Sequence, residues 1–384
     1  MSTLVLAGGG HAHVEVLRRF GVTRAEGLRL ILISPDTHTA YSGMLPGLVA
    51  GHYHWDQCHI DLRPLCDRAG AEFVVTRVDR IDPSARQVHC ANGQAFAFDA
   101  LSLDVGSTPD LRAVPGAVEH AVPVKPVSRL LEAWAGVAGR CGGRATDRPR
   151  IAVVGGGAGG VEIALAMRHH CHAADPALEP DIALVTDGFL PTHARWVRLL
   201  LTRAMAKHRV TIVGQGRVTR VTPGEIHCAS GPPVAADLVV WATGASAPAW
   251  ISESGLQCDD RGFVAVNDHL QSASHPSVFA AGDVATMVTR PLPKAGVFAV
   301  RQGPRLADNL HRFLAGDALR PYRPQRRFLS LISTGGRHAV ASYAGLSWQG
   351  RWVWTWKDRI DKRFMRKYDG VLWPVDAGDA YVRR

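Results

Sequence analysis

The chain contains Ile151-Ala152-Val153-Val154-Gly155-Gly156-Gly157-Ala158-Gly159-Gly160, a run of aliphatic residues that leads into five glycines. The residues that follow are compatible with a helix, so the order predicts a strand, a tight turn and a helix N-terminus. Gly155, Gly157 and Gly160 have the spacing GxGxxG, with Gly159 beside them. Glycines let the backbone approach a pyrophosphate, and a helix N-terminus offers free N–H groups and a positive dipole. The stretch therefore predicts a dinucleotide-binding turn.

A second copy of this pattern starts at the N-terminus, where Leu4–Ala7 precedes Gly8-Gly9-Gly10-His11-Ala12-His13. Gly8 and Gly10 keep the spacing, and we expect His11 and Ala12 to open the helix beside a second cofactor. His13 stands where the third glycine is expected, so its ring must either loosen the packing of helix on strand or replace it with a contact.

The acidic residue that binds an adenosine ribose is expected at the end of the next strand in each copy. In the first copy Ser34 holds that place and Asp36 follows, and two interpretations stay open: ribose binding, or a simple Ser-Pro-Asp turn. In the second copy Asp187 follows Leu184-Val185-Thr186. No arginine pair adjoins Asp187, which favours NADH over NADPH.

A third element, Val278-Phe279-Ala280-Ala281-Gly282-Asp283, ends in a pair that suits a flavin. Gly282 would let the backbone pass close to the cofactor, and Asp283 would accept a hydrogen bond from the ribityl chain. Gly244, after Trp241-Ala242-Thr243, and Gly106, after Asp104-Val105, mark the two strand-to-turn junctions at which we expect the domains to meet.

Together these motifs resemble the FAD-dependent pyridine nucleotide-disulfide oxidoreductase superfamily over essentially the whole chain. The resemblance implies an α/β fold of two Rossmann-like domains, the second inserted in the first. The expected boundaries are residues 1–115 and 245–323 for FAD, 116–244 for NAD(P)H, and 324–384 for a C-terminal segment. Within the superfamily the chain is most similar to the type II NADH dehydrogenase and sulfide:quinone reductase branch. Gly8–His13 and Tyr41–Gly47 further resemble a subgroup associated with selenide, water dikinase, which implies that enzyme as a partner.

The cysteines bear on the choice of branch. Cys58 and Cys66 are eight positions apart and do not have the spacing of a disulfide reductase pair, and no cysteine follows Cys258. The sequence therefore favours direct hydride transfer from NAD(P)H to flavin over persulfide chemistry, and we expect the seven cysteines to be reduced.

The resemblance also implies two catalytic residues. Glu162 matches the glutamate that lies near the nicotinamide–flavin contact in type II NADH dehydrogenases; a capping role at the helix terminus is the alternative. Lys294 stands where a cation could stabilise a reduced flavin, or could be a solvated surface lysine. The branch's quinone motif Ala-Gln-x-Ala aligns with Gly296–Ala299 and lacks the glutamine.

Charge is concentrated towards the C-terminus. Residues 290–384 hold 19 Lys/Arg and 7 Asp, a net +12 within a chain of 384 residues whose total is +10. Trp352, Trp356, Ile360 and Phe364 recur at i, i+4 and predict an apolar stripe on a helix. This stripe would contact a membrane or partner, or would dock on the protein itself. We expect a cytoplasmic protein, at most peripheral on the inner face of the membrane, because no apolar run is long enough to span a bilayer and no signal peptide is evident.

His52, His54, His59 and Cys58 form a loose group, but no second pair has metal-ligand spacing, so no metal is expected. The basic segment carries no nucleic-acid recognition motif. The sequence thus predicts an FAD-dependent NAD(P)H oxidoreductase that passes electrons to a small acceptor such as a quinone. Two alternatives stay open: a sulfur- or selenium-compound oxidoreductase, and a flavin-bound redox sensor.

Overall fold

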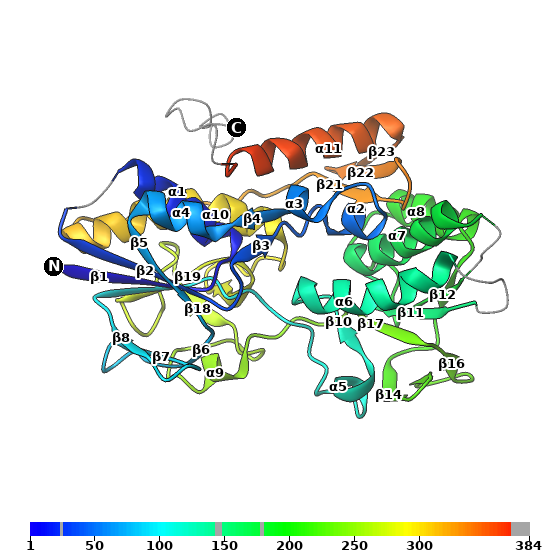
Figure 1. The fold of residues 1–384 in the computed structure, drawn as a ribbon, viewed down its shortest axis with the longest axis horizontal. Coiled ribbons are helices and arrows are strands. Elements are labelled where there is room, and N and C mark those ends of the chain that lie inside the picture. Colours follow the sequence, from blue (N-terminus) through cyan, green and yellow to red (C-terminus); the bar gives the residue numbers. More distant parts are fainter. Residues whose placement is uncertain (24–25, 143–147, 177–179, 370–384) are drawn as a thin grey trace.

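The computed structural model describes residues 1–23, 26–142, 148–176 and 180–369. Two parallel sheets form the centres of two lobes that lie side by side (Figure 1). The first sheet has the order β19-β9-β1-β2-β5, with bounds Val278–Ala280, Ala100–Leu103, Ser2–Ala7, Leu28–Ser34 and Ala71–Val75. The second has the order β10-β17-β11-β12-β13, with bounds Val122–Pro123, Leu238–Trp241, Arg150–Val154, Asp181–Val185 and Val210–Val213.

Helices cover these sheets because both faces of the strands are aliphatic and must be buried. The first lobe uses α1 (His11–Val22), α4 (Leu62–Ala69) and α10 (Gly296–Ala315). The second uses α6 (Val127–Ala138), α7 (Ala158–Ala174) and α8 (Arg195–Lys207). The chain completes the second sheet between β9 and β19 of the first. The predicted fold class, two nucleotide-binding units with the second inserted in the first, is confirmed.

Each lobe also carries a three-stranded antiparallel sheet: β6-β7-β8 in the first and β14-β15-β16 in the second. Their bounds are Val78–Asp82, Gln87–Cys90 and Ala95–Ala97, and Val218–Thr222, Glu225–Cys228 and Val234–Ala235. Shorter elements complete the two lobes: β3 (His38–Ala40), α2 (Leu45–Val49), α3 (Trp55–Cys58), β4 (His59–Asp61), α5 (Ala117–His120), α9 (Ala249–Ser252), β18 (Val264–Val266) and β20 (Ala285–Met287).

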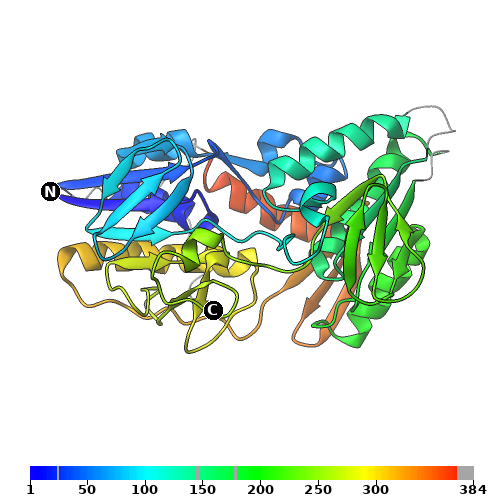
Figure 2. The ribbon, with the colours of Figure 1, turned by 90° about the horizontal axis from the view of Figure 1, so that it is seen from below.

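The C-terminal segment forms the antiparallel sheet β21 (Ser330–Ser333), β22 (Ala339–Tyr343) and β23 (Leu346–Gly350), followed by the helix α11 (Arg351–Arg366). In Figure 1, α11 lies along one side of the molecule and spans both lobes; Figure 2 shows it between them. No helix among the described residues combines the length and apolar character needed to cross a bilayer. Trp373 lies outside the described residues.

The predicted apolar stripe of α11 is not the face that docks. The buried face is one residue further along and comprises Val353, Lys357, Asp361 and Met365. Trp352 and Trp356 of the predicted stripe are exposed, whereas Phe364 stacks on Tyr41 with ring centroids 4.3 Å apart. The helix therefore docks on the protein, but through a buried Lys–Asp pair that helical hydrophobic periodicity does not reveal.

Candidate functional site

The first glycine turn is closed against the end of strand β9. Gly8 has φ +97, and a Cβ there would lie 2.5 Å from the carbonyl oxygen of Asp104, so glycine is required. His13 replaces the third glycine without loosening the turn. Its Nδ1 is 2.6 Å from the Gly8 carbonyl oxygen and its Nε2 is 2.8 Å from Ser102 Oγ. The buried ring thus replaces backbone packing with two hydrogen bonds.

Asp104 is a site residue that the sequence analysis did not single out. Its carboxylate accepts the backbone N–H of Ala12 at 2.8 Å and of His13 at 3.2 Å, so it caps α1 from inside the lobe. Burial raises the pKa of Asp104 to about 7, although these two hydrogen bonds oppose the rise. The only sequence signal was an acidic residue directly after the buried strand β9, Ala100–Leu103.

Around Asp104 the structure gathers the groups predicted to hold FAD. Asp283 accepts from Lys125 Nζ at 2.7 Å and from Ser107 Oγ at 3.3 Å, and Lys125 lowers the pKa of Asp283. His11 is half-buried, and desolvation of its ring lowers its pKa to about 4. Its Nε2 has no hydrogen-bond partner among the described residues, which a bound polar group would supply. These residues fit a dinucleotide at the N-terminus of α1.

The remaining predicted residues of the first lobe lie in three places: after β19, at and after the end of β2, and where the chain crosses between the lobes. Gly282 has φ +68 and donates its N–H to Gln302 Oε1 at 2.7 Å, and a Cβ there would overlap the Asp104 carboxylate. Ser34 is buried at the end of β2, whereas Asp36 is exposed two residues beyond it. Gly106 and Gly244 have φ +73 and +70 in the crossings between the lobes, where they allow the chain to turn.

The second glycine turn has room in front of it. Gly155 has φ +131 and packs on the backbone of Ala242 and Thr243, and a Cβ on Gly160 would overlap the carbonyl oxygen of Gly155. By contrast, a Cβ on Gly157 or Gly159 would meet open space. Gly157 is the N-cap of α7, so an anion placed there would meet the helix terminus directly. This geometry fits the pyrophosphate of a pyridine nucleotide.

Asp187 follows β12 and is exposed. The preceding residue, Thr186, is held by its own loop: its Oγ1 donates to the Gly188 carbonyl oxygen and accepts the Gly188 N–H, both at 2.9 Å. The carboxylate at the strand end is therefore accessible beside the second turn, the position expected for a ribose-binding acid.

Glu162, on α7, contacts β21 and interacts electrostatically with Lys357 of α11, so three parts of the chain meet at this residue. Its Oε1 accepts the backbone N–H of Ser333 in β21 at 2.8 Å, so it does not cap its own helix. Burial raises the pKa of Glu162 to about 7, with Lys357 opposing the rise. Lys357 on α11 donates to Asp361 Oδ2 at 2.6 Å and also to the Gly43 carbonyl oxygen, and Asp361 accepts a hydrogen bond from Tyr41.

We call four polar residues the junction cluster: Lys357 and Asp361 are buried, and Glu162 and Tyr41 are half-buried. Lys357 and Asp361 were not predicted, because oppositely charged residues at i, i+4 usually indicate a solvent-exposed helix face. Burial raises the pKa of Asp361 as well, so the cluster contains two carboxyl groups that bind protons more tightly than in water. A site of this kind can hold or release a proton near neutral pH.

Lys294 is not a solvated surface lysine. Its Nζ donates to the Ala285 carbonyl oxygen at 2.7 Å and to Thr286 Oγ1 at 3.0 Å, and lies 3.7 Å from the centre of the Phe263 ring. Burial lowers its pKa to about 8, while Asp259 and Asp283 favour the charged form. Lys294 thus adds a half-buried positive charge close to Asp283.

Cysteine chemistry has little support from this geometry. Burial raises the pKa of Cys58 and of Cys66 to about 12, which disfavours the nucleophilic thiolate, and both are free thiols. Cys171 is disulfide-bonded, so the expectation that every cysteine is reduced is wrong for this residue.

The histidines near Cys58 make ordinary contacts. His52 Nε2 lies 2.8 Å from the Gly335 carbonyl oxygen, and His59 Nδ1 lies 2.7 Å from that of Trp55. Within the described part of the chain, no group of three or more His, Cys, Asp or Glu residues is arranged to hold a metal ion.

Comparison with known proteins identifies the family. The family model described as pyridine nucleotide-disulphide oxidoreductase matches residues 2–309. The chain belongs to this family. It is therefore an oxidoreductase of the type that uses FAD and a pyridine nucleotide, in agreement with the fold and the two glycine turns. Membership of an enzyme family leaves the non-enzymatic redox sensor without support.

Several relatives are described as NADH dehydrogenase-like proteins or as NADH:quinone oxidoreductases. An NADH dehydrogenase-like protein of Mycobacterium tuberculosis is 29% identical over 59% of this chain, and the match spans 58% of that protein's own length. The NADH dehydrogenase-like protein YutJ of Bacillus subtilis is 22% identical, over 88% of this chain and 91% of that protein. A type II NADH:quinone oxidoreductase of Staphylococcus epidermidis is also 22% identical, over 96% of both chains.

Solved structures share the fold. The sulfide:quinone oxidoreductase of Aquifex aeolicus superposes with a TM-score of 0.80 at 18% identity, covering 98% of this chain and 93% of that one. NDH2 of Plasmodium falciparum in complex with NADH also superposes with a TM-score of 0.80, at 14% identity, covering 96% of this chain and 97% of that one. At these identities the likeness concerns the fold alone, which includes the C-terminal segment.

Proposed function

We propose that this protein transfers electrons from NADH to a quinone, with FAD as its bound cofactor. The observation that carries the proposal is the junction cluster, which places a glutamate with a pKa of about 7 where the NAD(P)H-binding unit, the first lobe and α11 meet. Reduction of a quinone consumes protons as well as electrons, so a buried proton-binding group at this junction suits that acceptor.

The second glycine turn and Asp187 support NADH as the donor. The N-terminus of α7 would bind the pyrophosphate, and the exposed Asp187 carboxylate would accept hydrogen bonds from a ribose. The same negative charge would repel the 2′-phosphate of NADPH. We propose Gly155, Gly157, Gly159 and Gly160 as the other residues of this binding site.

In the first lobe, we propose that Gly8, Gly10, His11 and Ala12 contact the FAD pyrophosphate, with Ser34 and Asp36 near the adenosine. Gly106, Gly244, Gly282 and Asp283 would border the ribityl chain and the ring. FAD, when bound, supplies a carrier that accepts two electrons as hydride and can return them. Lys294 and Lys125 then provide positive charge beside Asp283 that favours an anionic cofactor.

The junction cluster would handle the proton. Glu162 is positioned by the Ser333 N–H, and the Lys357 ammonium opposes part of the burial penalty on its carboxylate. Near pH 7 Glu162 exchanges between its protonated and ionised forms, as a proton donor to a reduced quinone must. Tyr41, Asp361 and Lys357 are linked by hydrogen bonds and would connect Glu162 to further protons.

Respiratory quinones are dissolved in the membrane, so the part of the protein that binds the quinone must lie against a membrane. The exposed aromatic side chains of α11 suit peripheral contact with the inner face of the membrane, with the rest of the protein in the cytoplasm. The second candidate, a sulfur or selenium substrate, has the raised pKa of Cys58 against it. A partnership with selenide, water dikinase depends only on the resemblance of Gly8–His13 and Tyr41–Gly47.

An anaerobic stopped-flow experiment tests the proposal. NADH should bleach the flavin of the purified holoprotein, and a water-soluble quinone should restore its colour faster than oxygen, polysulfide or selenite does. The proposal fails if neither NADH nor NADPH bleaches the flavin, or if quinone does not reoxidise it.

A further inference from the structure

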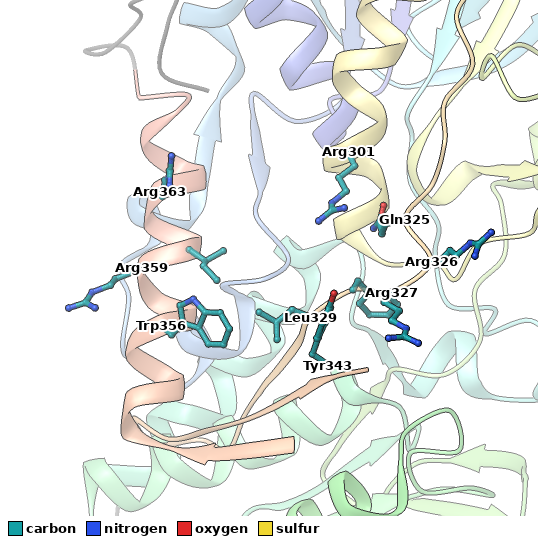
Figure 3. A pocket seen from close by; sticks show the side chains of 11 residues that line it. Arg301, Gln325, Arg326, Arg327, Leu329, Tyr343, Trp356, Arg359 and Arg363 are labelled. Carbon is teal, nitrogen blue, oxygen red and sulfur yellow. The ribbon is translucent and has the colours of Figure 1, made fainter. Parts of the chain in front are cut away.

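A cavity of about 780 Å³ lies between α11 and α10, outside the junction cluster and the two glycine turns. The segment 325–329 and Tyr343 of β22 complete its lining. In Figure 3, Arg301 from α10 and Trp356 from α11 point towards the space between the two helices. The volume is large enough for an organic ligand or for the headgroup of a lipid.

The residues that line the cavity carry a net positive charge. Among the residues that the structure describes, no acidic side chain borders the cavity and five arginines do: Arg301, Arg326, Arg327, Arg359 and Arg363. In the described ranges, no ion pair joins any of these five to a carboxylate. Their neighbours differ: Arg305 and Arg312 on α10 pair with Asp308, and Lys362 on α11 pairs with Asp358. Unpaired cations around a concave site are the arrangement that binds an anion.

Apolar side chains share this surface with the arginines. Trp356, Phe328 and Tyr343 line the cavity, and these large side chains are 39%, 37% and 44% exposed. The apolar surface continues past the cavity along the β22–β23 hairpin and the start of α11, with Leu346, Trp348 and Trp352 at 61%, 39% and 56% exposure. A small soluble anion would leave these side chains in water, whereas a lipid surface would cover them.

We propose that this cavity binds the headgroup of an anionic phospholipid, with the exposed aromatics of α11 and the hairpin at the depth of the surrounding headgroups. The arginines would contact the lipid phosphates, and Trp356 and Leu329 the apolar part of the molecule. The inference deepens the membrane contact included in the proposed function, and it adds selectivity for anionic over zwitterionic lipid.

Two variants of equal charge separate a specific site from general attraction. Arg301→Gln with Arg327→Gln removes two cations from the cavity. Arg217→Gln with Arg220→Gln removes two at β14, which lies on the opposite side of the molecule from α11 (Figure 1). Co-sedimentation of each holoprotein with vesicles of phosphatidylcholine, with or without phosphatidylglycerol, measures the partition. Calorimetry with dihexanoyl phosphatidylglycerol, dissolved as monomers, measures the headgroup alone.

The wild-type protein should sediment with the phosphatidylglycerol vesicles and bind the short-chain lipid saturably. The cavity variant should lose about thirtyfold in partition, because each cation near a lipid surface contributes about 1 kcal/mol. The β14 variant should partition as the wild type does. Equal losses from both variants, equal partition onto neutral vesicles, or no saturable binding of the short-chain lipid would each overturn the proposal.

Bleaching of the flavin by NADH, measured in solution without lipid, should be unchanged in both variants, so loss of lipid binding is distinguishable from failure of the proposed function.

Discussion

Glu162→Gln is the most informative single substitution, because the structure determines both the magnitude and the pH dependence of its expected effect on the free energy of unfolding. Glu162 is half-buried, and its Oε1 accepts the Ser333 N–H at 2.8 Å. A glutamine oxygen can accept the same hydrogen bond, so the change removes the ionisable proton and keeps the contact. The pKa of Glu162 rises from 4.5 to about 7 on burial. At about 1.4 kcal/mol per pH unit, this corresponds to about 3 kcal/mol.

The sign follows from where the proton is bound. Between pH 4.5 and about pH 7 the native carboxyl keeps a proton that the unfolded chain has released. The free energy of unfolding therefore falls as the pH rises through this window, and above it the full loss of about 3 kcal/mol remains. Glu162→Gln has no such loss. It should match the wild type near pH 4 and be more stable by up to about 3 kcal/mol near pH 8.

Urea denaturation of the holoprotein at about pH 5 and about pH 8 measures this difference. Glu132→Gln, on the exposed side of α6, is the matched control and should shift neither midpoint. The reasoning is refuted if Glu162→Gln changes the free energy of unfolding equally at both pH values, or if it destabilises the protein at the higher one.

The same variant tests the assignment of Glu162 to proton transfer. Ferricyanide accepts electrons without protons, so NADH:ferricyanide turnover should be retained. Quinone reduction should fall roughly a hundredfold, the usual size of a general-acid contribution, and lose its inflection near pH 7. Equal loss with both acceptors would instead assign Glu162 to NADH binding or to structure.

Three further substitutions test the nucleotide sites. Gly160→Ala places a methyl group against the Gly155 carbonyl oxygen and should lower the stability of the turn by about 1–3 kcal/mol. The affinity for NADH should fall in a flavin-bleaching titration, while the FAD content stays normal. Weaker FAD binding with unchanged NADH binding would contradict this expectation. Asp104→Asn removes a carboxyl whose pKa of about 7 lets it ionise at the site proposed for the FAD pyrophosphate. The wild type should therefore release more flavin as the pH rises above 7 and the variant should not, as followed by flavin fluorescence. His13→Gly loses the hydrogen bonds to Gly8 and Ser102 and leaves a cavity, and should lower stability by about 3 kcal/mol in a denaturation experiment; an unchanged midpoint would show that the ring does not support the turn.

Much of the first-order architecture could be predicted because its signals are local. The glycine at position 155 and the strand before it lie within one short stretch, and the steric requirement for φ +131 depends on that backbone. Glu162 was singled out by resemblance, through its place after the turn, and its catalytic role stays a prediction. Its partner Ser333 was not, because the contact joins residues 171 positions apart.

The C-terminal helix illustrates where such prediction fails. Helical periodicity identified the stripe that begins at Trp352, yet the helix docks through Lys357 and Asp361. Helical periodicity identifies an apolar face, and charged residues at i, i+4 are normally expected on the solvent-exposed face. Only the surrounding fold supplies the Gly43 carbonyl oxygen and the Tyr41 hydroxyl that make burial of such a pair favourable.

The order of residues alone determined that this protein has two glycine turns, each between a strand and a helix, and hence two nucleotide-binding units. Tertiary structure alone decided which polar groups meet: Asp104 at the terminus of α1, the junction cluster, and the arginines that line the cavity between α10 and α11. The physical reason is the separation along the chain over which each property is determined. Backbone conformation depends on neighbouring atoms, whereas hydrogen bonding and the pKa of a buried group depend on segments that only the folded chain brings together.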